Sequence, residues 1–492
     1  MNTPTGSHPR VEKLTYVKTK IIATIGPASE SLDTIRDMAL AGADIFRLNF
    51  AHGSHEWLGQ IVSRIRQVSE ELKRPIGILG DLSGPKIRLH ELPGDAIRCQ
   101  HGETFEFVRG AQTDDPHKLT CTYAPLVDEL AVGNVIMLAD GTVGMRVVEK
   151  HAAEGRLVCV VEQPGTFKSR QGLNLPGAML STPCLTDKDR DDLKWALQIG
   201  LDFIGLSFVR KAEDIRELQE AMAAHHPAVT PLIVAKIEKM EAIAELDRIL
   251  ELTDAVMVAR GDLGVEVDIA RVPMLQKRVI KMCNQHRIPV ITATQMLDSM
   301  QHHSRPTRAE ASDVANAVLD GSDAVMLSGE SAAGEFPVES VFMMSRLAHE
   351  AERFMGPREE TDHFSAPRSR ALAVTEAVTQ GAGKVAAMLG AEVIAVATES
   401  GRTALAVSKQ RLSIPVLGVS TMPESTRRMT LYWGVTPILS SASEQDQRQL
   451  LEEVIAWLKR ETSLHTGSKL VLVTSSNWSA EGHDSLLVHS MP

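Results

Sequence analysis

Aromatic residues are scarce in this 492-residue sequence, at 4% of the chain. Surfaces that bind single-stranded nucleic acid stack its bases on aromatic rings, so a partner of that kind is not expected. The net charge is −11, and no long block carries charge of one sign. This argues against a nucleic-acid partner or an anionic membrane. Any affinity for phosphate must therefore come from local clusters of positive side chains.

Cysteine and long apolar runs are also scarce. The five cysteines are odd in number, are widely spaced and form no CxxC pair: Cys99, Cys121, Cys159, Cys184 and Cys283. This pattern is typical of a reducing compartment and predicts neither a disulfide framework nor a zinc site. The first 20 residues lack the apolar segment of a signal peptide. No apolar run approaches the ~20 residues that a membrane-spanning helix needs. We therefore expect a cytoplasmic protein.

The length predicts about three domains, at ~150 residues for each. From residue 20, short apolar runs alternate with amphipathic stretches. We expect strands at 20–24, 43–49 and 75–81, with helices at 31–41 and about 55–72 between them. Strand–helix–strand alternation predicts a parallel sheet with right-handed crossovers.

This rhythm is interrupted at residues 86–183. Hairpin signals such as Asp140-Gly141 and Pro164-Gly165 flank Val-rich runs there, and no long helix is evident. We expect an all-β lid inserted after the third strand. The rhythm resumes with a capping box at Thr186 and Asp189. Further strands are predicted at 203–206, up to 236, up to 259, at 289–293 and at 324–327.

Eight strand–helix units predict a (β/α)8 barrel. A helix at 307–319 should be capped by Thr307 and Glu310, and we expect one of its faces to hold Ala311, Val314, Ala315, Val318 and Leu319. After residue 351 a small open α/β domain is expected, with strands at 393–397, 415–419 and 469–473. The expected organisation is a tail (1–17), a barrel (18–85 and 184–350), a lid (86–183) and a C-terminal domain (351–492).

Polar side chains follow most of the predicted barrel strands. Because the carboxyl ends of the strands share one mouth of a barrel, these residues should lie close together. They are Arg47, Asn49, Asp81, Ser207, Lys236, Glu238, Gly261, Asp262, Thr294, Ser328 and Glu330. A lone aspartate after a strand is more often a helix cap than a ligand. The convergence of so many polar groups on one rim nevertheless predicts a functional site.

The chemical types at this rim suit a metal and a phosphoryl group. Glu238 and Asp262 are hard oxygen ligands of the kind that Mg²⁺ prefers. Lys236 is a mobile point charge that can follow a phosphoryl group in transfer, and Arg47 offers a planar fork to a phosphate. The amides of Gly261 and Asp262 suit a carboxylate. Thr294 offers a hydroxyl near a reacting carbon.

Several of these segments resemble the motifs of pyruvate kinases. They are Ile233-Val234-Ala235-Lys236-Ile237-Glu238, Met257 to Gly264, Ile291 to Leu297, Pro306 to Glu310, Met326 to Glu330 and Thr24-Ile25-Gly26-Pro27. The resemblance begins near residue 18, covers nearly the whole chain and keeps the order of the motifs. It implies a barrel, an inserted β lid and a C-terminal α/β domain in a homotetramer. It also implies glycolytic phosphoryl transfer from phosphoenolpyruvate to ADP, giving pyruvate and ATP, with Mg²⁺ or Mn²⁺.

The resemblance also implies roles for individual residues. Arg47 would bind the phosphate, Lys236 would stabilise the phosphoryl group in transfer, and Thr294 would lie beside the enolate. Glu238 and Asp262 would ligate Mg²⁺, while Gly261 and Asp262 would bind the substrate. The residues on the nucleotide side would be Asn49, His52 and Arg88.

Three positions depart from the K⁺-dependent members of this family. Ala51 and Leu82 stand where a serine and a threonine are usual, and Lys86 stands where a glutamate is usual. We expect Lys86 to act as an internal cation in place of K⁺, as in the K⁺-independent bacterial type, so that K⁺ is not required. In the alternative interpretation Lys86 is a solvated lid residue.

Two further segments bear on nucleotide and effector binding. Gln171 replaces a lysine that often contacts nucleotide, and the sequence leaves open whether Lys168 or Arg170 substitutes for it. The effector loop is expected at Ser400, Gly401, Arg402 and Thr403. The last loop, Ser475 to Asp484, carries Glu481 and no arginine, so an activating monophosphate (a sugar phosphate or AMP) is expected rather than a bisphosphate.

Two other functions share part of this pattern. Another barrel enzyme that uses Mg²⁺ and a pyruvate enolate, such as an aldolase or a carboxyl-transfer enzyme, would share the metal but not the phosphoryl acceptor. The lid and Lys236 favour the kinase. A non-catalytic sensor of sugar phosphates would be favoured by loss of Lys236, Glu238 or Asp262, and all three are present.

Overall fold

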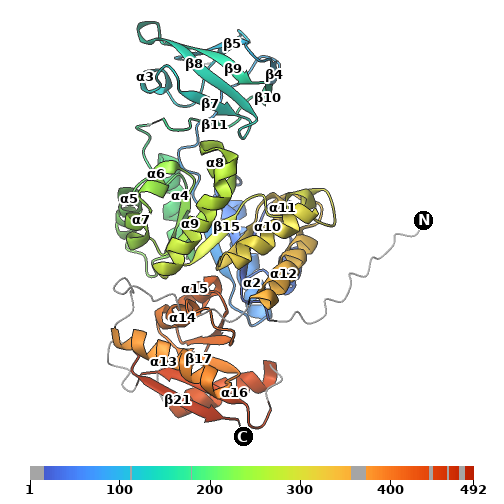
Figure 1. Cartoon of the computed structure of the whole chain (residues 1–492), viewed down its shortest axis with the longest axis vertical. Helices are drawn as coiled ribbons and strands as arrows, with labels where there is room; N and C mark the ends of the chain where they lie inside the picture. Colours follow the sequence, from blue (N-terminus) through green and yellow to red (C-terminus); the bar gives the residue numbers. More distant parts are fainter. Residues whose placement is uncertain are drawn as a thin grey trace, which may run out of the picture.

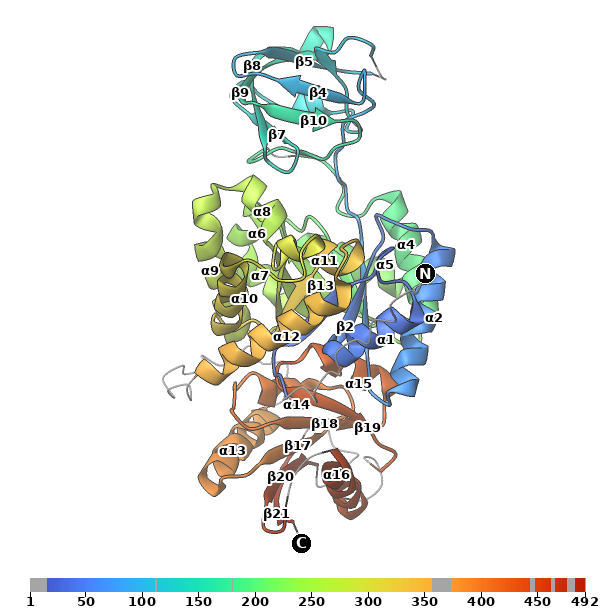
Figure 2. The ribbon, with the colours of Figure 1, turned by 90° about the vertical axis from the view of Figure 1, so that its right-hand side faces the viewer.

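In the computed structural model the chain has three parts arranged along one long axis (Figures 1 and 2). The structure describes residues 16–110, 113–178, 180–355, 373–442, 447–461, 465–475 and 483–491. The barrel lies in the middle, the inserted β domain lies at one end and the C-terminal α/β domain lies at the other. Residues 1–15 of the expected N-terminal tail lie outside the described residues.

The central part is a closed barrel of eight parallel strands, as predicted. Its order is β1-β16-β15-β14-β13-β12-β3-β2. The strands are β1 (Lys20–Thr24), β2 (Ile45–Asn49), β3 (Gly77–Asp81), β12 (Phe203–Leu206), β13 (Leu232–Ile237), β14 (Ala255–Ala259), β15 (Val290–Ala293) and β16 (Ala324–Leu327). They are short apolar runs buried on both faces, because helices cover the outside and side chains fill the inside.

The helices follow the strands around the barrel. They are α1 (Leu32–Ala41), α2 (His55–Glu71), α4 (Asp187–Ile199), α5 (Ala212–Ala223), α6 (Met240–Ala244), α7 (Leu246–Leu252), α8 (Arg260–Glu266), α9 (Val272–Gln285), α10 (Arg308–Leu319), α11 (Gly329–Ala332) and α12 (Pro337–Phe354). Both predicted capping boxes are present, at Thr186 on α4 and at Thr307 on α10. None of the helices in the described part of the chain has the length and apolarity to cross a membrane.

The expected apolar face of α10 is partly wrong. Val314 and Val318 are buried, but Leu319 is 40% exposed, and Ala317 is buried instead. The helix packs against α12, and tertiary contacts of this kind, rather than the apolar pattern alone, fix its rotation about its axis.

Four aspartates form a repeating contact at the amino ends of the strands. Each aspartate lies directly before a barrel strand. Its carboxylate accepts a hydrogen bond from a backbone amide at the start of the barrel strand that precedes it in the sequence and pairs with it. The pairs are Asp44 with Ile21 (3.0 Å), Asp202 with Ile78 (2.9 Å), Asp254 with Ile233 (2.9 Å) and Asp323 with Val290 (2.8 Å). Each aspartate amide also donates to the carbonyl of the same partner residue. The carboxylates therefore satisfy buried amides at the start of β1, β3, β13 and β15.

The inserted domain is built from strands, as predicted. A six-stranded sheet has the order β11-β7-β8-β9-β5-β6, and β10 pairs with β4. The strands are β4 (Ala96–Cys99), β5 (Thr104–Val108), β6 (Lys118–Leu119), β7 (Val135–Leu138), β8 (Val143–His151), β9 (Arg156–Gln163), β10 (Gly165–Lys168) and β11 (Leu173–Asn174). Within its described residues the single α-helix is the short α3 (Leu126–Glu129).

The C-terminal domain has a five-stranded sheet of order β19-β18-β17-β20-β21. Its elements are α13 (Ala373–Leu389), β17 (Val393–Ala397), α14 (Arg402–Ser408), β18 (Val416–Ser420), α15 (Pro423–Arg428), β19 (Val435–Leu439), α16 (Gln447–Glu461), β20 (Lys469–Thr474) and β21 (Ser485–Ser490). The sequence analysis predicted β17, β18 and β20 and missed the two edge strands. Pro437 obscures β19 because a proline is compatible only with a strand edge, and β21 is largely exposed, with no buried apolar run.

Candidate active site at the carboxyl ends of the barrel strands

Lys236 is the centre of the predicted rim. Its ammonium lies 2.7 Å from the Ser207 hydroxyl, 3.0 Å from a Glu238 oxygen and 3.4 Å from an Asp81 oxygen. The side chain is 11% exposed. Burial by itself would lower the pKa of Lys236, but attraction to Asp81 and Glu238 outweighs burial and raises it. The lysine is therefore held in its charged form.

Arg47 lies on the other side of Asp81. Its guanidinium donates to an Asp81 oxygen at 2.7 Å and to the Thr24 hydroxyl at 3.1 Å. Burial would raise the pKa of Asp81, but the charges of Lys236 and Arg47 lower it overall. One buried carboxylate thus holds two cations side by side, and both are available to a dianionic phosphate.

Two carboxylates form the predicted metal site. Glu238 is 1% exposed, and its second oxygen accepts from the Phe208 amide at 2.8 Å. Burial raises the pKa of Glu238, Lys236 opposes this, and the charge of Asp262 raises it further. Asp262 is near enough to repel Glu238, and a divalent cation would relieve that repulsion. No group of three or more His, Cys, Asp or Glu residues suited to a metal occurs among the described residues. The pair suits Mg²⁺, which takes one or two carboxylates and fills the remaining positions with water and substrate oxygens.

The loop after β15 presents Thr294 in a strained backbone. Thr294 and Gln295 have φ angles of 68° and 53°, in the left-handed region that side chains disfavour. The Thr294 hydroxyl accepts from the Gly261 amide at 2.8 Å and donates to the Ala293 carbonyl at 2.6 Å. In this arrangement the Gly261 amide, expected to bind substrate, is already engaged by Thr294.

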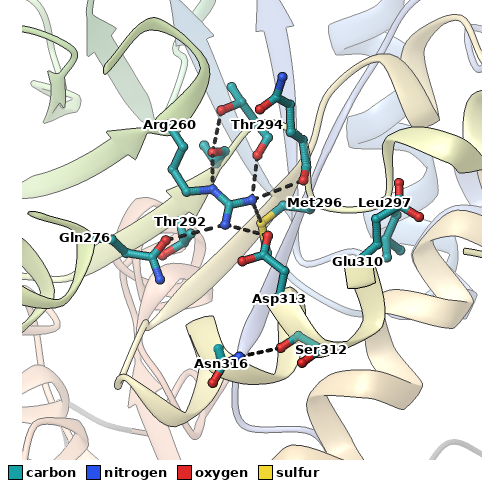
Figure 3. A network of polar contacts seen from close by, with 12 residues as sticks. Arg260, Gln276, Thr292, Thr294, Met296, Leu297, Glu310, Ser312, Asp313 and Asn316 are labelled. Atoms are coloured by element: carbon teal, nitrogen blue, oxygen red, sulfur yellow. Dashed lines mark hydrogen bonds and ion pairs between the residues drawn. The ribbon is translucent and has the colours of Figure 1, made fainter. Parts of the chain in front are cut away.

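Arg260 holds this loop from beneath and was not singled out in the sequence analysis. Its guanidinium donates to the carbonyls of Ala293 (3.3 Å), Thr294 (2.7 Å) and Gln295 (3.2 Å). It also pairs with Asp313 on α10 at 2.6 Å (Figure 3). Arg260 is 8% exposed, so it supports the loop and does not face solvent. In the sequence, only its position beside Gly261-Asp262 suggests a role at this site. The loop that its side chain contacts is decided by the tertiary structure.

Glu330 and Ser328, also on the predicted rim, are hydrogen-bonded to the backbone or to each other. The Glu330 carboxylate accepts from the amides of Leu297 (3.0 Å) and Ser328 (2.7 Å) and is 1% exposed. It therefore satisfies two backbone donors inside the barrel.

The three expected nucleotide-side residues are divided between two domains. Asn49 ends β2, where its side-chain oxygen accepts from the Ala51 amide at 3.1 Å, and His52 is exposed on the following turn. Arg88 lies in the inserted domain, where its guanidinium donates to the Arg170 carbonyl at 3.2 Å. Asn49 and His52 therefore share the barrel rim, while Arg88 approaches from the lid side.

The three positions that depart from the K⁺-dependent members also lie in different surroundings. Leu82 is buried against the barrel, and Ala51 is exposed on the turn after β2. Lys86 is exposed in the segment that leads into the inserted domain, and its side chain lies against Gly172. Within the described part of the chain, no carboxylate lies within ion-pairing distance of its ammonium.

The segment around Gln171 distinguishes the two candidate substitutes for the missing lysine. The Gln171 side chain accepts from the Lys168 amide at 2.8 Å. The Arg170 guanidinium donates to Glu91 at 2.6 Å, whereas the Lys168 side chain is exposed.

The expected effector loop begins α14. Gly401 (φ 83°) is the residue before the helix, and its amide donates to the Thr398 hydroxyl at 3.0 Å. The Thr403 hydroxyl lies 2.9 Å from the imidazole of His483. Burial lowers the pKa of His483, so this ring is neutral near pH 7. Glu481, which was expected to disfavour a second phosphate, lies outside the described residues.

Comparison with known proteins assigns the whole arrangement to one family. The barrel-domain profile of pyruvate kinases matches residues 16–341, and the alpha/beta-domain profile matches residues 376–489. The chain is 43% identical to a pyruvate kinase of Geobacillus stearothermophilus over 418 residues, 85% of this chain and 71% of that one. It is 39% identical to a pyruvate kinase of Bacillus licheniformis over 474 residues, 96% of this chain and 80% of that one.

A solved structure agrees with these matches. The crystal structure of a pyruvate kinase from Cryptosporidium parvum has a TM-score of 0.89 and 33% identity, covering 97% of this chain and 96% of the other. The closed barrel with its inserted sheet domain, the rim of charged residues and both domain profiles lead to one conclusion: this chain belongs to the pyruvate kinase family.

Proposed function

We propose that this chain transfers a phosphoryl group from phosphoenolpyruvate to ADP in a Mg²⁺-dependent reaction that gives pyruvate and ATP. The observation that carries the proposal is the buried group of Lys236, Asp81 and Arg47, in which one carboxylate holds two cations. Such a group attracts a phosphate while the cations stay fixed in position. Preorganised charge of this kind is the main protein contribution to phosphoryl transfer.

Each cation has its own role in this proposal. Arg47 binds the phosphate of phosphoenolpyruvate through its planar fork, and Asp81 keeps the fork oriented. Lys236, held by Asp81, Glu238 and Ser207, offsets the charge that develops on the phosphoryl group as this group moves toward the ADP oxygen. Charged hydrogen bonds to Asp81 and Glu238 keep Lys236 protonated throughout.

Glu238 and Asp262 would hold Mg²⁺, and Mn²⁺ would partly substitute because it also accepts oxygen ligands. When bound there, the ion supplies positive charge that stabilises an enolate oxygen and the phosphoryl oxygens. Thr294 lies at the next strand end, where its hydroxyl is held by Gly261 and Ala293. A substrate carboxylate that takes the Gly261 and Asp262 amides would release this hydroxyl toward the reacting carbon.

ADP would bind between the barrel rim and the lid. Asn49 and His52 would meet it from the barrel, and Arg88 from the inserted domain. Lys168 is a better substitute for the missing lysine at Gln171 than Arg170, which is paired with Glu91. A lid movement that brings Arg88 toward His52 would complete the site and exclude water.

Lys86 would supply a positive charge that K⁺ supplies in other members of the family. Its ammonium is exposed in the hinge segment, and no described carboxylate neutralises it. Lid closure would carry it toward the phosphate site, where Ala51 and Leu82 leave K⁺ without two hydroxyl ligands.

The domain boundaries and the assembly are also proposals. We propose a barrel at 18–85 and 184–350, a lid at 86–183 and a regulatory domain at 351–492. We also propose a cytoplasmic homotetramer, in which neighbouring copies would cover exposed apolar side chains such as Met274 on α9 (61% exposed) and Val488 on β21 (43%). Light scattering in solution gives the mass that decides the number of chains.

The metal requirement tests the overall proposal. ATP formation from phosphoenolpyruvate and ADP should stop when EDTA removes divalent ions and return with Mg²⁺ or, in part, with Mn²⁺. Glu238→Gln should raise the Mg²⁺ concentration needed for half-maximal activity, because it removes an anionic ligand. Glu266→Gln, whose carboxylate pairs with Lys239, is the matched control. Activity that persists in saturating EDTA would exclude the two-carboxylate metal site.

Replacing Lys236 tests its role in transfer. Lys236→Met should lower kcat by ~10²–10³-fold, the usual effect of losing one preorganised stabilising group. Binding of phosphoenolpyruvate should weaken much less, and protonation of enolpyruvate should survive, since it depends on the metal and the Thr294 side. Lys239→Met, three residues further on, is the control. Near wild-type phosphoryl transfer in Lys236→Met would refute the assignment.

Potassium independence is tested with matched salts. The wild type should be nearly equally active in K⁺ and in tetramethylammonium buffers of the same ionic strength. Lys86→Glu should lose most activity in both, and K⁺ should not restore it fully while Ala51 and Leu82 remain. Lys118→Glu, which changes another lysine of the inserted domain, should keep its activity. A severalfold activation of the wild type by K⁺ contradicts the proposed internal cation.

The effector proposal is tested by titration. Ser400, Gly401, Arg402 and Thr403 begin α14 and suit one phosphate. A sugar monophosphate or AMP should bind and activate, and Thr403→Val should weaken that binding without changing the unactivated rate. Calorimetry with fructose 1,6-bisphosphate should show no tight, activating binding. Tight bisphosphate binding would show that the loop has a different specificity.

A further inference from the structure

We propose that Lys409 and Arg427 of the C-terminal domain are positioning residues. Through two buried aspartates, they fix the positions of the strands that lead to Thr294 and Asp81. The inference rests on the roles proposed above for those two residues. It starts from the repeating aspartates at the amino ends of the barrel strands, two of which also receive cations from the C-terminal domain.

The first contact is made to Asp323. The Lys409 ammonium lies 2.6 Å from the same Asp323 oxygen that accepts from the Val290 amide. Lys409 also donates to the Ile288 carbonyl at 2.8 Å, and Arg411 lies 3.0 Å from the second Asp323 oxygen. The Lys409 and Asp323 side chains are both 0% exposed. Burial lowers the pKa of Lys409 to about 8, although attraction to Asp323 opposes the shift. A buried pair of this kind fixes geometry closely, because water cannot replace either partner.

The second contact is made to Asp202. The Arg427 guanidinium on α15 lies 2.6 Å from one Asp202 oxygen. The other oxygen accepts from the Ile78 amide and pairs with Arg66 of the barrel at 2.9 Å. Asp202 is therefore shared between the barrel and the C-terminal domain, and it directly contacts the start of β3.

Each contact lies at the start of a strand that ends in the active site. Along β3, Asp81 lies three residues after Ile78, or ~10 Å, and along β15, Ala293 lies three residues after Val290, or ~10 Å, with Thr294 as the next residue. Both strands are short, and each is hydrogen-bonded to a neighbouring strand on both sides in the closed barrel, so we treat each as a stiff segment in this proposal. A shift of its start is therefore transmitted to its end. Misplacement of reacting groups by 1 Å can lower rates ~10²-fold, so a few tenths of an ångström are enough to matter.

Lys409 also directly follows α14, whose first turn is the proposed effector loop. The same contact therefore connects that loop with β15. The positioning role does not require an effector to bind there.

The test is a pair of crossed double-mutant cycles measured as kcat/KM for phosphoenolpyruvate. Arg427→Met and Lys409→Met should each lower kcat/KM about threefold to tenfold. Arg427→Lys should restore much of the loss, because it keeps the charge beside Asp202. Glu376→Gln is the matched control, since Glu376 pairs with Arg287 across the same interface without touching a strand-start aspartate. This control should stay within twofold of wild type.

The cycles identify which strand carries each effect. The Arg427→Met effect should shrink below twofold in an Asp81→Asn background and persist in a Thr294→Val background. The Lys409→Met effect should persist in the Asp81→Asn background and shrink below twofold in the Thr294→Val background. Amide exchange should quicken at Ile78 alone in Arg427→Met and at Val290 alone in Lys409→Met, whereas a general loss of stability would quicken both. The proposal is overturned if Arg427→Met and Lys409→Met each lower kcat/KM by the same factor in both backgrounds as in the wild type.

Two other results have separate meanings. If Asp81→Asn or Thr294→Val alone leaves activity intact, the proposed active site is wrong, and the positioning proposal falls with it. If both of these active-site substitutions lower activity but Arg427→Met has the same kcat/KM as the control Glu376→Gln, the proposed active site stands and the positioning role is refuted. Should Lys409→Met fail to fold, the Arg427 arm decides, because Asp202 keeps Arg66 as a partner in that variant.

Discussion

The carboxylate of Asp81 is the interaction on which the rest of the active site depends. It is 1% exposed and lies between Arg47 and Lys236, which would otherwise repel each other. Removing one partner from a buried ion pair typically costs about 3–5 kcal/mol, because the remaining charge is left without compensation. The barrel can therefore keep two cations adjacent and dehydrated only while Asp81 is ionised, and their attraction lowers its pKa to ensure this.

The loop that carries Thr294 shows how a strained segment is stabilised. Two consecutive residues with positive φ are unfavourable in isolation. Arg260 compensates by binding three successive carbonyls of the loop, and Asp313 on α10 neutralises its charge (Figure 3). The local backbone is thus determined by side chains from α8 and α10, which lie outside the loop's own segment of the sequence. Such exceptions to local preference are expected where a hydroxyl must be presented to a substrate.

The two ends of the barrel serve different purposes, but the strands connect them. Charged groups at the carboxyl ends form the proposed active site, whereas aspartates at the amino ends satisfy amides at the starts of alternate strands. The C-terminal domain packs against the amino ends, and the inserted domain lies beyond the carboxyl ends (Figures 1 and 2). The C-terminal domain, which we propose to be regulatory, meets the starts of the barrel strands at these amino ends. The two shared aspartates, Asp202 and Asp323, provide that contact.

The sequence by itself determined the order of the barrel strands, the inserted β domain and the convergence of Lys236, Glu238, Arg47 and Asp81 on one rim. It could do so because apolar runs that are buried on both faces, and the polar residues that end them, are local signals. Only the tertiary structure decided the rotation of α10, the edge strands β19 and β21, the Arg260 support of Thr294 and the contacts of Asp202 and Asp323 with the C-terminal domain. These features depend on which distant segments pack together. A buried arginine or aspartate reads the same in sequence as an exposed one until its partners are known.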